Sequence, residues 1–507
     1  MFLFNELFLF KQSSLFYIVV SYDLVFPMTL ISNAKWNAFS QLFKIIIQLL
    51  NLIYLAKIIP PSEYGLMAMT AVVVNLGTLL RDLGTSAALI QRKELNEKLK
   101  NTIFWINLIM GVAIAIAICL LSPVLSAVYN QPELLSVFIL ISVIFPLSSS
   151  AAAHLALMER ASQFRKISYI EITSSVFSVI VAIIMANLGY GVFSLVGQAI
   201  TLNLMSAIQF WRASTWRPSI KEFICKEELR NVFGFSANLS MFNLINYLSR
   251  NGDSFIIGKY MSAAILGSYN LAYRIMLFPL QSLTFVASRS LYPILSRQQD
   301  DNKKINKTYN DCVFVIVLIT APLMTGIALL SHPFINLTFG NQWEVTADVL
   351  KWLAPTAIIQ SILSTTGSVF TAKGRTDILM RLGILGTVLQ FGSFLIGVHF
   401  SIVTFAFCYL IANVLNFIPV MLSLMYVISG SFFIFIRQLM PIIISTLVML
   451  FVINIFGHYF IPINDISNYW QLILTSVVGA VIYVISMLTL SFKIRFFIFN
   501  KLFKVKS

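Results

Sequence analysis

Long apolar runs constrain this chain more than any other feature. From Trp36 onward, about fourteen runs of roughly 20 residues alternate with short polar breaks. A helix of about 20 apolar residues spans the hydrocarbon core of a bilayer. The chain is 58% hydrophobic and only 11% charged, whereas soluble domains carry about 25% charged residues. The sequence therefore predicts an all-α, polytopic membrane protein with about 14 transmembrane helices.

The expected helices follow one another closely, and no break is long enough to hold a soluble domain. Their ranges are 36–58, 65–90, 101–122, 134–156, 167–187, 190–211, 232–256, 263–288, 311–331, 348–370, 378–398, 401–427, 432–456 and 470–491. The largest connection, between the sixth and seventh helices, contains Pro218 and is interpreted as a linker between two halves.

Basic residues mark alternate breaks and set the expected orientation. Of the 35 Lys and Arg residues, 25 lie in every second break or in the C-terminal tail. The breaks 122–133, 331–347 and 457–469 contain none. Cytoplasmic loops carry the excess of Lys and Arg. Both termini are therefore expected in the cytoplasm, which requires an even number of helices, and the net charge of +15 does not point to nucleic acid.

The N-terminal stretch differs from the rest of the chain. Residues 1–27 are apolar but interrupted by Lys11 and Asp23, without the pattern of a signal peptide. We interpret residues 1–31 as an extension, with translation expected to begin at Met28. Deletion of residues 1–27 is then expected to leave function intact.

The two halves of the chain repeat each other. Lys57 and Gly65 correspond to Lys259 and Gly267 at an offset of 202, and Pro146 corresponds to Pro355 at an offset of 209. Both repeats begin on the same side, which predicts two six-helix bundles in a parallel repeat, with two further C-terminal helices. The expected organisation is 1–31 extension, 32–215 first bundle, 216–231 cytoplasmic linker, 232–428 second bundle, 429–492 two additional helices, and 493–507 basic cytoplasmic tail.

Matching polar stripes run along the first helix of each half. The seventh helix carries Ser236, Ser240, Asn243, Asn246, Arg250 and Asp253 at steps of 3 or 4, which keeps them on one face. At the offset of 202, the last four correspond to Gln41, Lys44, Gln48 and Asn51 of the first helix. Two matching stripes in a repeat architecture are expected to line the cavity between the halves.

Charged side chains in the apolar runs are costly and therefore are candidates for a functional site. The basic candidates are Lys44, Arg81, Arg250 and Arg274, and the acidic ones are Asp82, Glu171 and Asp253. Lys44 and Arg274 have no acid nearby in sequence, so an anion is the favoured ligand, and guanidinium groups suit phosphate. For Arg250 with Asp253 and for Arg81 with Asp82, a local ion pair is an open alternative.

Other chemistries find little support in the sequence. The four cysteines are scattered, the four histidines are isolated, and no phosphate-binding loop or nucleophile motif is present. We expect no metal site, no cofactor and no catalytic residues. Direct use of ATP is also not expected.

Taken together, these residues and several short motifs resemble a known family. The chain is similar to the Wzx-type polysaccharide flippases, the lipopolysaccharide and colanic-acid exporter group of the multidrug/oligosaccharidyl-lipid/polysaccharide (MOP) superfamily, over about residues 29–427. The matching stretches are Lys35-Trp36, Ser62–Met69, Asp82–Gly84, Ala88–Lys93, Gly189–Val192, Trp216–Pro218, Ile256–Lys259, Tyr292-Pro293, Gln299–Asp301 and Ala372–Arg375. The chain departs from the family at Asn251-Gly252-Asp253-Ser254, because the family has Asn-Leu-Asp-Asn there.

The resemblance implies a transporter and not an enzyme. It implies two bundles in a V-shaped arrangement with alternating access, in the bacterial inner membrane. The implied substrate is an oligosaccharide on an isoprenoid pyrophosphate carrier, moved to the periplasmic leaflet for surface polysaccharide, O-antigen or exopolysaccharide synthesis. Membrane lipid, a polysaccharide polymerase and the chain-length machinery are the implied partners.

The roles of the candidate residues follow from the expected cavity. Lys44, Arg81, Arg250, Arg274, Gln41, Gln48, Asn51, Asn243 and Asn246 are expected to bind substrate. Asp82, Glu171 and Asp253 are expected to couple transport to an ion, because a carboxyl group in a low-dielectric site can titrate near neutral pH. A multidrug exporter of the same superfamily is the main alternative, and a membrane polysaccharide polymerase is the less favoured one.

Overall fold

The computed structural model is helical throughout, with no strand among the residues that it describes. These are residues 28–82, 89, 95–220, 224–225, 251–456 and 468–495, and for 28–42, 82, 278–290 and 468 the backbone alone is described. Within these ranges, 11 helices are long and apolar enough to cross a membrane. The predicted fold class, a polytopic helical membrane protein, is confirmed.

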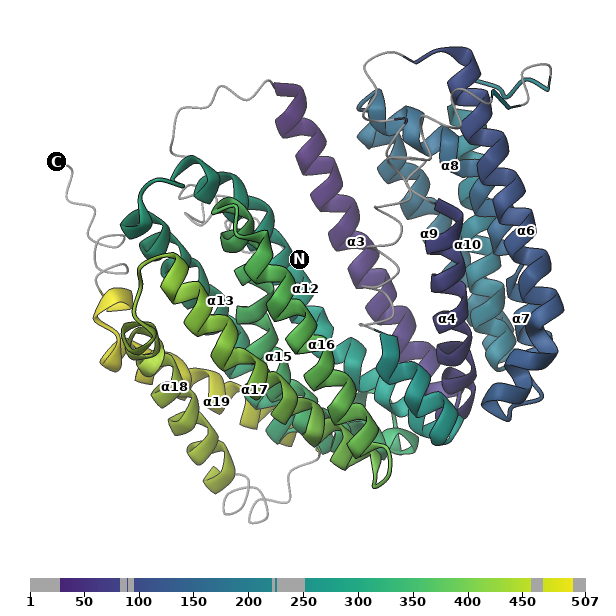
Figure 1. Ribbon diagram of the computed structural model, residues 1–507. Helices are drawn as coiled ribbons and strands as arrows, with labels where there is room; N and C mark the ends of the chain where they lie inside the picture. Colours follow the sequence, from purple (N-terminus) through teal and green to yellow (C-terminus); the bar gives the residue numbers. More distant parts are fainter. Residues whose placement is uncertain are drawn as a thin grey trace, which may run out of the picture.

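The first half of the chain forms one group of helices, on the right in Figure 1, with α3 at its inner edge. Its members are α3 (Met28–Ile58), α4 (Pro61–Asp82), α6 (Glu97–Tyr129), α7 (Leu134–Ile141), α8 (Ile144–Arg160), α9 (Phe164–Asn187) and α10 (Val192–Ala213). The helix α3 packs mainly on α9, while α10 packs on α8 and α9. The edge position of α3 leaves one of its sides available to the space between the halves.

The second half forms the group on the left in Figure 1. After a helical segment at 251–260 it consists of α12 (Ala263–Arg297), α13 (Asn302–Leu329), α14 (Ser331–Thr338), the short 3₁₀ turn η2 (Asn341–Trp343), α15 (Glu344–Ala372), α16 (Thr376–Gly397), α17 (Ile402–Val427), α18 (Phe432–Ile455) and α19 (Asn468–Leu490). The last two pack on each other and on α13. Most of the expected seventh helix lies outside the described residues.

Several helix boundaries differ from the sequence-based expectation; for example, α6 continues to Tyr129 and α14 lies in an expected break. The expected helix 134–156 is divided into α7 and α8, with a turn at residues 142–143. Pro146 has no N–H to donate to the carbonyl of Ser142, and its ring collides with that carbonyl, so the helix breaks there. The helix α12 continues to Arg297 and α13 already begins at Asn302, so both are longer than expected. The Asp301 side chain caps α13 by accepting a hydrogen bond from the Lys304 N–H.

The hydrophobic core connects the two halves at one end only. One cluster combines buried residues of both halves, among them Leu55, Met69, Leu266 and Leu353. The clusters nearer the basic connections each belong to one half. The bundles therefore pack together on the side opposite the basic connections, where α4 and α12 begin and contact each other.

The connection after α10 is held against the first bundle. The indole N–H of Trp105 donates to the Ser219 carbonyl at 3.0 Å, and the Trp216 indole donates to Glu97 Oε2 at 2.9 Å. The Asn101 side chain accepts from the Ser219 N–H at 2.7 Å. The start of the expected linker is thus attached to the first two turns of α6.

Candidate functional site

Four helices line a cavity between the two halves. Its volume is about 220 Å³, and it is bounded by α3, α4 and α10 of the first half and by α12 of the second. The lining residues are Leu52, Tyr64, Met67, Ala68, Leu195, Gln198, Ala199, Leu202, Asn270, Leu271 and Arg274. Most of this surface is apolar, so a few polar groups decide which ligand it can hold.

Arg274 is the charged group of this cavity. It lies 11 residues into α12, about 16 Å along the helix, and is exposed. No hydrogen bond or ion pair joins Arg274 to another residue in the described part of the chain, although it interacts electrostatically with Tyr64. An arginine at this depth, open to a cavity and without a carboxylate, is suited to bind an anionic ligand group. Asn270, one helical turn before Arg274, also lines the cavity.

Lys44, the other predicted anion-binding residue, has an acidic partner in the structure. Its Nζ lies 2.6 Å from Oε2 of Glu171 on α9, and the two side chains are 16% and 34% exposed. Lys44 has no acid nearby in sequence because its partner, Glu171, is 127 positions away. The sequence-based expectation of an unpaired Lys44 therefore does not hold in this conformation. Two predicted site residues with different expected roles form one ion pair, which fastens the edge helix α3 to α9.

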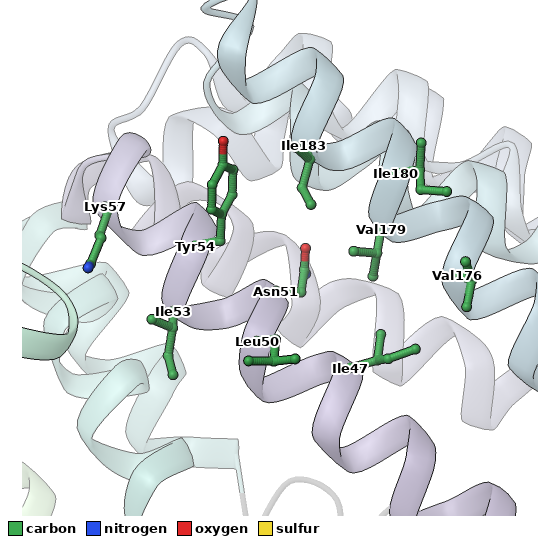
Figure 2. Close-up of a pocket in the computed structure, with 10 residues that line it drawn as sticks. All are labelled: Ile47, Leu50, Asn51, Ile53, Tyr54, Lys57, Val176, Val179, Ile180 and Ile183. Carbon is green, nitrogen blue, oxygen red and sulfur yellow. The ribbon is translucent and has the colours of Figure 1, made fainter. Parts of the chain in front are cut away.

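Asn51 connects the polar stripe of α3 to the cavity. Its Nδ2 donates to Oε1 of Gln198 at 3.3 Å, and Gln198 lines the cavity beside Arg274. On its other side, Asn51 borders an apolar groove of about 490 Å³ between α3 and α9. Figure 2 shows this groove, with Ile47 of α3 pointing toward Val176 and Val179 of α9. The Asn51–Gln198 pair therefore lies between the cavity that holds Arg274 and the apolar groove.

The remaining predicted residues of the first half are placed differently. Arg81 donates to the Ser148 hydroxyl of α8 and so bridges two helices of one bundle. Gln48 is exposed on α3. The side chains of Gln41 and Asp82 lie outside the described part of the structure, as do Asn243, Asn246 and Arg250, so the proposed Arg250–Asp253 pair is not described.

Asp253 belongs to a buried polar network of the second bundle. Its side chain is 4% exposed and accepts hydrogen bonds from the Tyr269 hydroxyl at 2.8 Å and from the Ser254 N–H at 2.6 Å. A second buried polar pair lies in the same bundle, where Gln360 Nε2 of α15 donates to the Tyr409 hydroxyl of α17 at 2.6 Å. Sequence reasoning did not select these tyrosines and this glutamine, since no charge or stripe marks them.

The departure from the family pattern at Gly252 has a packing explanation. A Cβ at this position would overlap the ring of Phe391, with Cε1 of that ring 2.8 Å away. The surrounding segment 251–260 is helical, so Gly252 allows α16 to approach without breaking the helix. Asp253 is therefore held in a helix that lies directly against α16.

The fold and the cavity define a class: a polytopic α-helical transporter made of two helix bundles. The chain belongs to the family described as polysaccharide biosynthesis protein, which matches residues 54–348. This finding confirms the resemblance to the polysaccharide flippases.

Individual relatives support the assignment to this family. Lipopolysaccharide biosynthesis protein WzxC of Escherichia coli K12 is 28% identical over 376 residues, which are 72% of this chain and 75% of the relative. Teichuronic acid biosynthesis protein TuaB of Bacillus subtilis 168 is 26% identical over 427 residues, 83% of this chain and 87% of the relative. By name, the first takes part in lipopolysaccharide biosynthesis and the second in teichuronic acid biosynthesis.

Solved structures of the same fold include two kinds of transporter. The lipid II flippase MurJ, in an inward closed conformation, has a TM-score of 0.69 at 16% identity, covering 92% of this chain and 99% of its own. An inward-facing multidrug resistance transporter of the MATE family in the MOP superfamily has a TM-score of 0.57 at 16% identity, covering 76% and 94%. At this identity the likeness establishes the fold alone.

Proposed function

We propose that the protein flips a lipid-linked oligosaccharide across the bacterial inner membrane by alternating access. The observation that carries this proposal is Arg274, an exposed arginine in a cavity between the bundles to which no carboxylate of the described residues is bound. A diphosphate that links a sugar to an isoprenoid offers the oxygens that a guanidinium group binds in bidentate fashion. The relatives that take part in polysaccharide synthesis support the same substrate class.

The polar and apolar surfaces suit an amphiphilic substrate. Asn270 and Gln198 beside Arg274 offer amide groups to phosphate or sugar hydroxyls. Because Lys44 is neutralised by Glu171 in this conformation, we assign the primary anion contact to Arg274. Lys44, Arg81, Arg250 and the amide side chains of the two stripes remain proposed substrate contacts for other steps of the cycle.

Ion coupling is proposed for the acidic residues. Asp253 is the strongest of the three candidates, because it is buried with hydroxyl and amide partners and no described cation. A carboxyl group in such surroundings can exchange a proton or a cation as the bundle changes conformation. Asp82 and Glu171 are the other candidates.

Orientation and partners complete the proposal. Both termini are proposed to lie in the cytoplasm, since the basic connections follow the positive-inside rule. A polysaccharide polymerase and the chain-length machinery are proposed to act on the product at the outer leaflet. The protein itself is proposed to be a transporter without enzymatic activity.

Deletion of the gene and analysis of lipid-linked glycans test the function. We expect loss of surface polysaccharide and accumulation of lipid-linked repeat units in the inner leaflet. For the site, Arg274→Ala is expected to abolish surface polysaccharide at normal protein levels, while Arg274→Lys retains part of it. Arg437→Ala, at an exposed position of α18, serves as the matched control. An unchanged glycan profile in the deletion strain would refute the proposal.

The alternative, a multidrug exporter, makes a different prediction. Organic cations favour a neutral or acidic cavity, whereas the charged group that lines this one is an arginine. Deletion is therefore expected to leave drug susceptibility unchanged. Increased susceptibility with an intact glycan profile would favour the multidrug exporter.

A further inference from the structure

The helices α4 and α12 approach closely at their first turns, on the side opposite the basic connections. A Cβ on Gly65 would overlap the carbonyl group of Ala263 and lie 2.9 Å from its Cα. A Cβ on Gly267 would overlap the carbonyl of Pro61 and lie 2.9 Å from the Gly65 nitrogen. We call these four residues the glycine crossing.

The glycine crossing is reciprocal under the internal repeat. The offset of 202 relates Pro61 to Ala263 and Gly65 to Gly267. Gly65 contacts Ala263, and its repeat equivalent Gly267 contacts Pro61, which is the repeat equivalent of Ala263. Such mutual contact between equivalent patches is the mark of an isologous interface around a two-fold axis. The local axis that relates the two bundles accordingly passes between α4 and α12.

Glycine is required at both positions in this conformation. The atoms that a new Cβ would meet are backbone atoms of the facing helix, which cannot move aside as a flexible side chain can. Small residues at helix crossings in membranes allow backbones to approach in this way. An alanine at either position would therefore force the two helices apart.

Hydrogen bonds across the same face reinforce the contact. The last carbonyls of a helix have no partner within it, and here the opposite half supplies one. Trp343 Nε1 donates to the Ala56 carbonyl at the end of α3 at 2.7 Å, and Lys259 Nζ donates to the Val128 carbonyl at the end of α6 at 2.6 Å. Trp343 is fully buried and its ring packs edge-on against Tyr64, with centroids 5.3 Å apart.

We propose that the glycine crossing closes the cavity on its extracytoplasmic side and sets the balance between the two access states. The inference rests on the proposed alternating access, since a state open to the outside must separate α4 from α12. A Cβ at Gly65 or Gly267 destabilises the closed state and leaves the separated state unaffected. Alanine at either position therefore shifts the population toward the outward-open state.

Cysteine labelling of the full-length protein in intact cells tests this proposal. The reporter is Ala68→Cys, a cavity-lining position one turn from Gly65, in a background where the four native cysteines are replaced by serine. A membrane-impermeant maleimide is added from outside. Gly65→Ala and Gly267→Ala are each expected to raise the labelling rate about tenfold or more. Gly367→Ala and Gly383→Ala, where a Cβ meets nothing within 4 Å, are the matched controls and are expected to have no effect.

A milder variant guards against loss of folded protein. Trp343→Phe keeps most of the buried ring and removes the hydrogen bond to Ala56, so labelling is expected to rise about two- to tenfold. Unchanged labelling in the glycine variants and in Trp343→Phe overturns the proposal, as does an equal rise in the two control variants.

The labelling result and the glycan result separate the two proposals. Labelling reports only whether the cavity is open to the outside, and the glycan profile reports only transport. A shift in labelling together with a normal glycan profile in the deletion strain supports the closure and refutes the flippase function. The opposite outcome, with no shift in labelling and a glycan defect on deletion, refutes the closure and leaves the proposed function in place.

Discussion

Lys44 could bind a substrate anion or attach one helix to another, and its ion pair with Glu171 allows these two roles to be distinguished. The pair joins α3 to α9, the helix on which α3 mainly packs. Removal of Lys44 could abolish transport because a substrate anion loses its contact, or because α3 loses its attachment. The geometry favours the second role in this conformation, since Nζ lies 2.6 Å from Oε2 and both side chains are largely shielded from solvent.

The size of the effect follows from the burial of the pair. Exposed ion pairs contribute about 0.2–1 kcal/mol, and removal of one partner from a buried pair costs about 3–5 kcal/mol. The side chains of Lys44 and Glu171 are 16% and 34% exposed, which places the pair between these limits. We expect Lys44→Gln to lower the free energy of unfolding by about 1–3 kcal/mol, mainly because the Glu171 carboxylate is left without a partner.

A double-mutant cycle measures this coupling directly. Lys44→Gln, Glu171→Gln and the double variant are compared for surface polysaccharide at matched protein levels and for thermal unfolding in detergent. We expect both single variants to be impaired and the double variant to recover most of the stability and activity. Lys100→Gln is the control, because its partner Glu97 is 61% exposed and lies on the same helix, so about 0.5 kcal/mol or less is expected.

One result would refute this reasoning. A double variant that is as stable as the wild type but as inactive as Lys44→Gln would show that the lysine charge itself is needed. Lys44 would then be assigned to the anion-binding site, as the sequence predicted. Its ion pair with Glu171 would have to break during transport.

Three further changes test other contacts of the structure. Tyr269→Phe removes the hydroxyl that donates to Asp253 and is expected to lower the stability measured by thermal unfolding by about 1–3 kcal/mol. Tyr426→Phe, at a side chain that is 81% exposed, is expected to cause no loss. Equal unfolding midpoints for the two variants would contradict the role of the Tyr269 hydroxyl. Trp216→Phe removes the indole bond to α6 and is expected to speed limited proteolysis of the linker, and an unchanged cleavage rate would count against linker attachment. Phe370→Ala empties a fully buried site and is expected to cost about 3–5 kcal/mol, which a normal unfolding midpoint would disprove.

The sequence predicts the helices well because length and polarity decide them. A run of about 20 apolar residues has few alternatives in a membrane, and the long described helices each overlap one of the expected runs, whereas the short α14 lies in an expected break. The division of 134–156 was missed, although Pro146 was the available signal. The extensions of α12 and α13 were missed because polar helix ends beyond the membrane carry no apolar pattern.

The site is predictable only within single helices. Arg274 was selected from the sequence as a charged residue in an apolar run, and it lines the cavity together with Asn270, one helical turn before it. Contacts between helices depend on packing, which a single sequence does not encode in its local pattern, so the partner of Lys44 and the hydroxyl of Tyr269 were not found. The internal repeat is the exception, because it relates residues of the two halves that are far apart in sequence. Gly65 and Gly267, which correspond in the repeat, are in direct contact in the structure.

The repeat also provides the sharpest test of ion coupling. Asn51 and Asp253 are repeat equivalents at an offset of 202, and each is buried and hydrogen-bonded inside its own half. The second half has thus replaced an amide by a carboxyl group where the first half functions without a charge. Asp253→Asn retains an oxygen for the Tyr269 hydroxyl and loses at most the bond from Ser254, so about 1 kcal/mol or less of stability is expected to be lost.

If Asp253 only stabilises the bundle, the asparagine variant should transport nearly normally. If it couples transport to an ion, the same variant should fold, appear at normal levels and fail to deliver polysaccharide to the surface. We expect the second outcome, measured by surface glycan analysis beside thermal unfolding, with Asn51→Asp as the reciprocal control. A stable and fully active Asp253→Asn would remove Asp253 from the coupling mechanism, because the charge would then serve no step that an amide cannot perform.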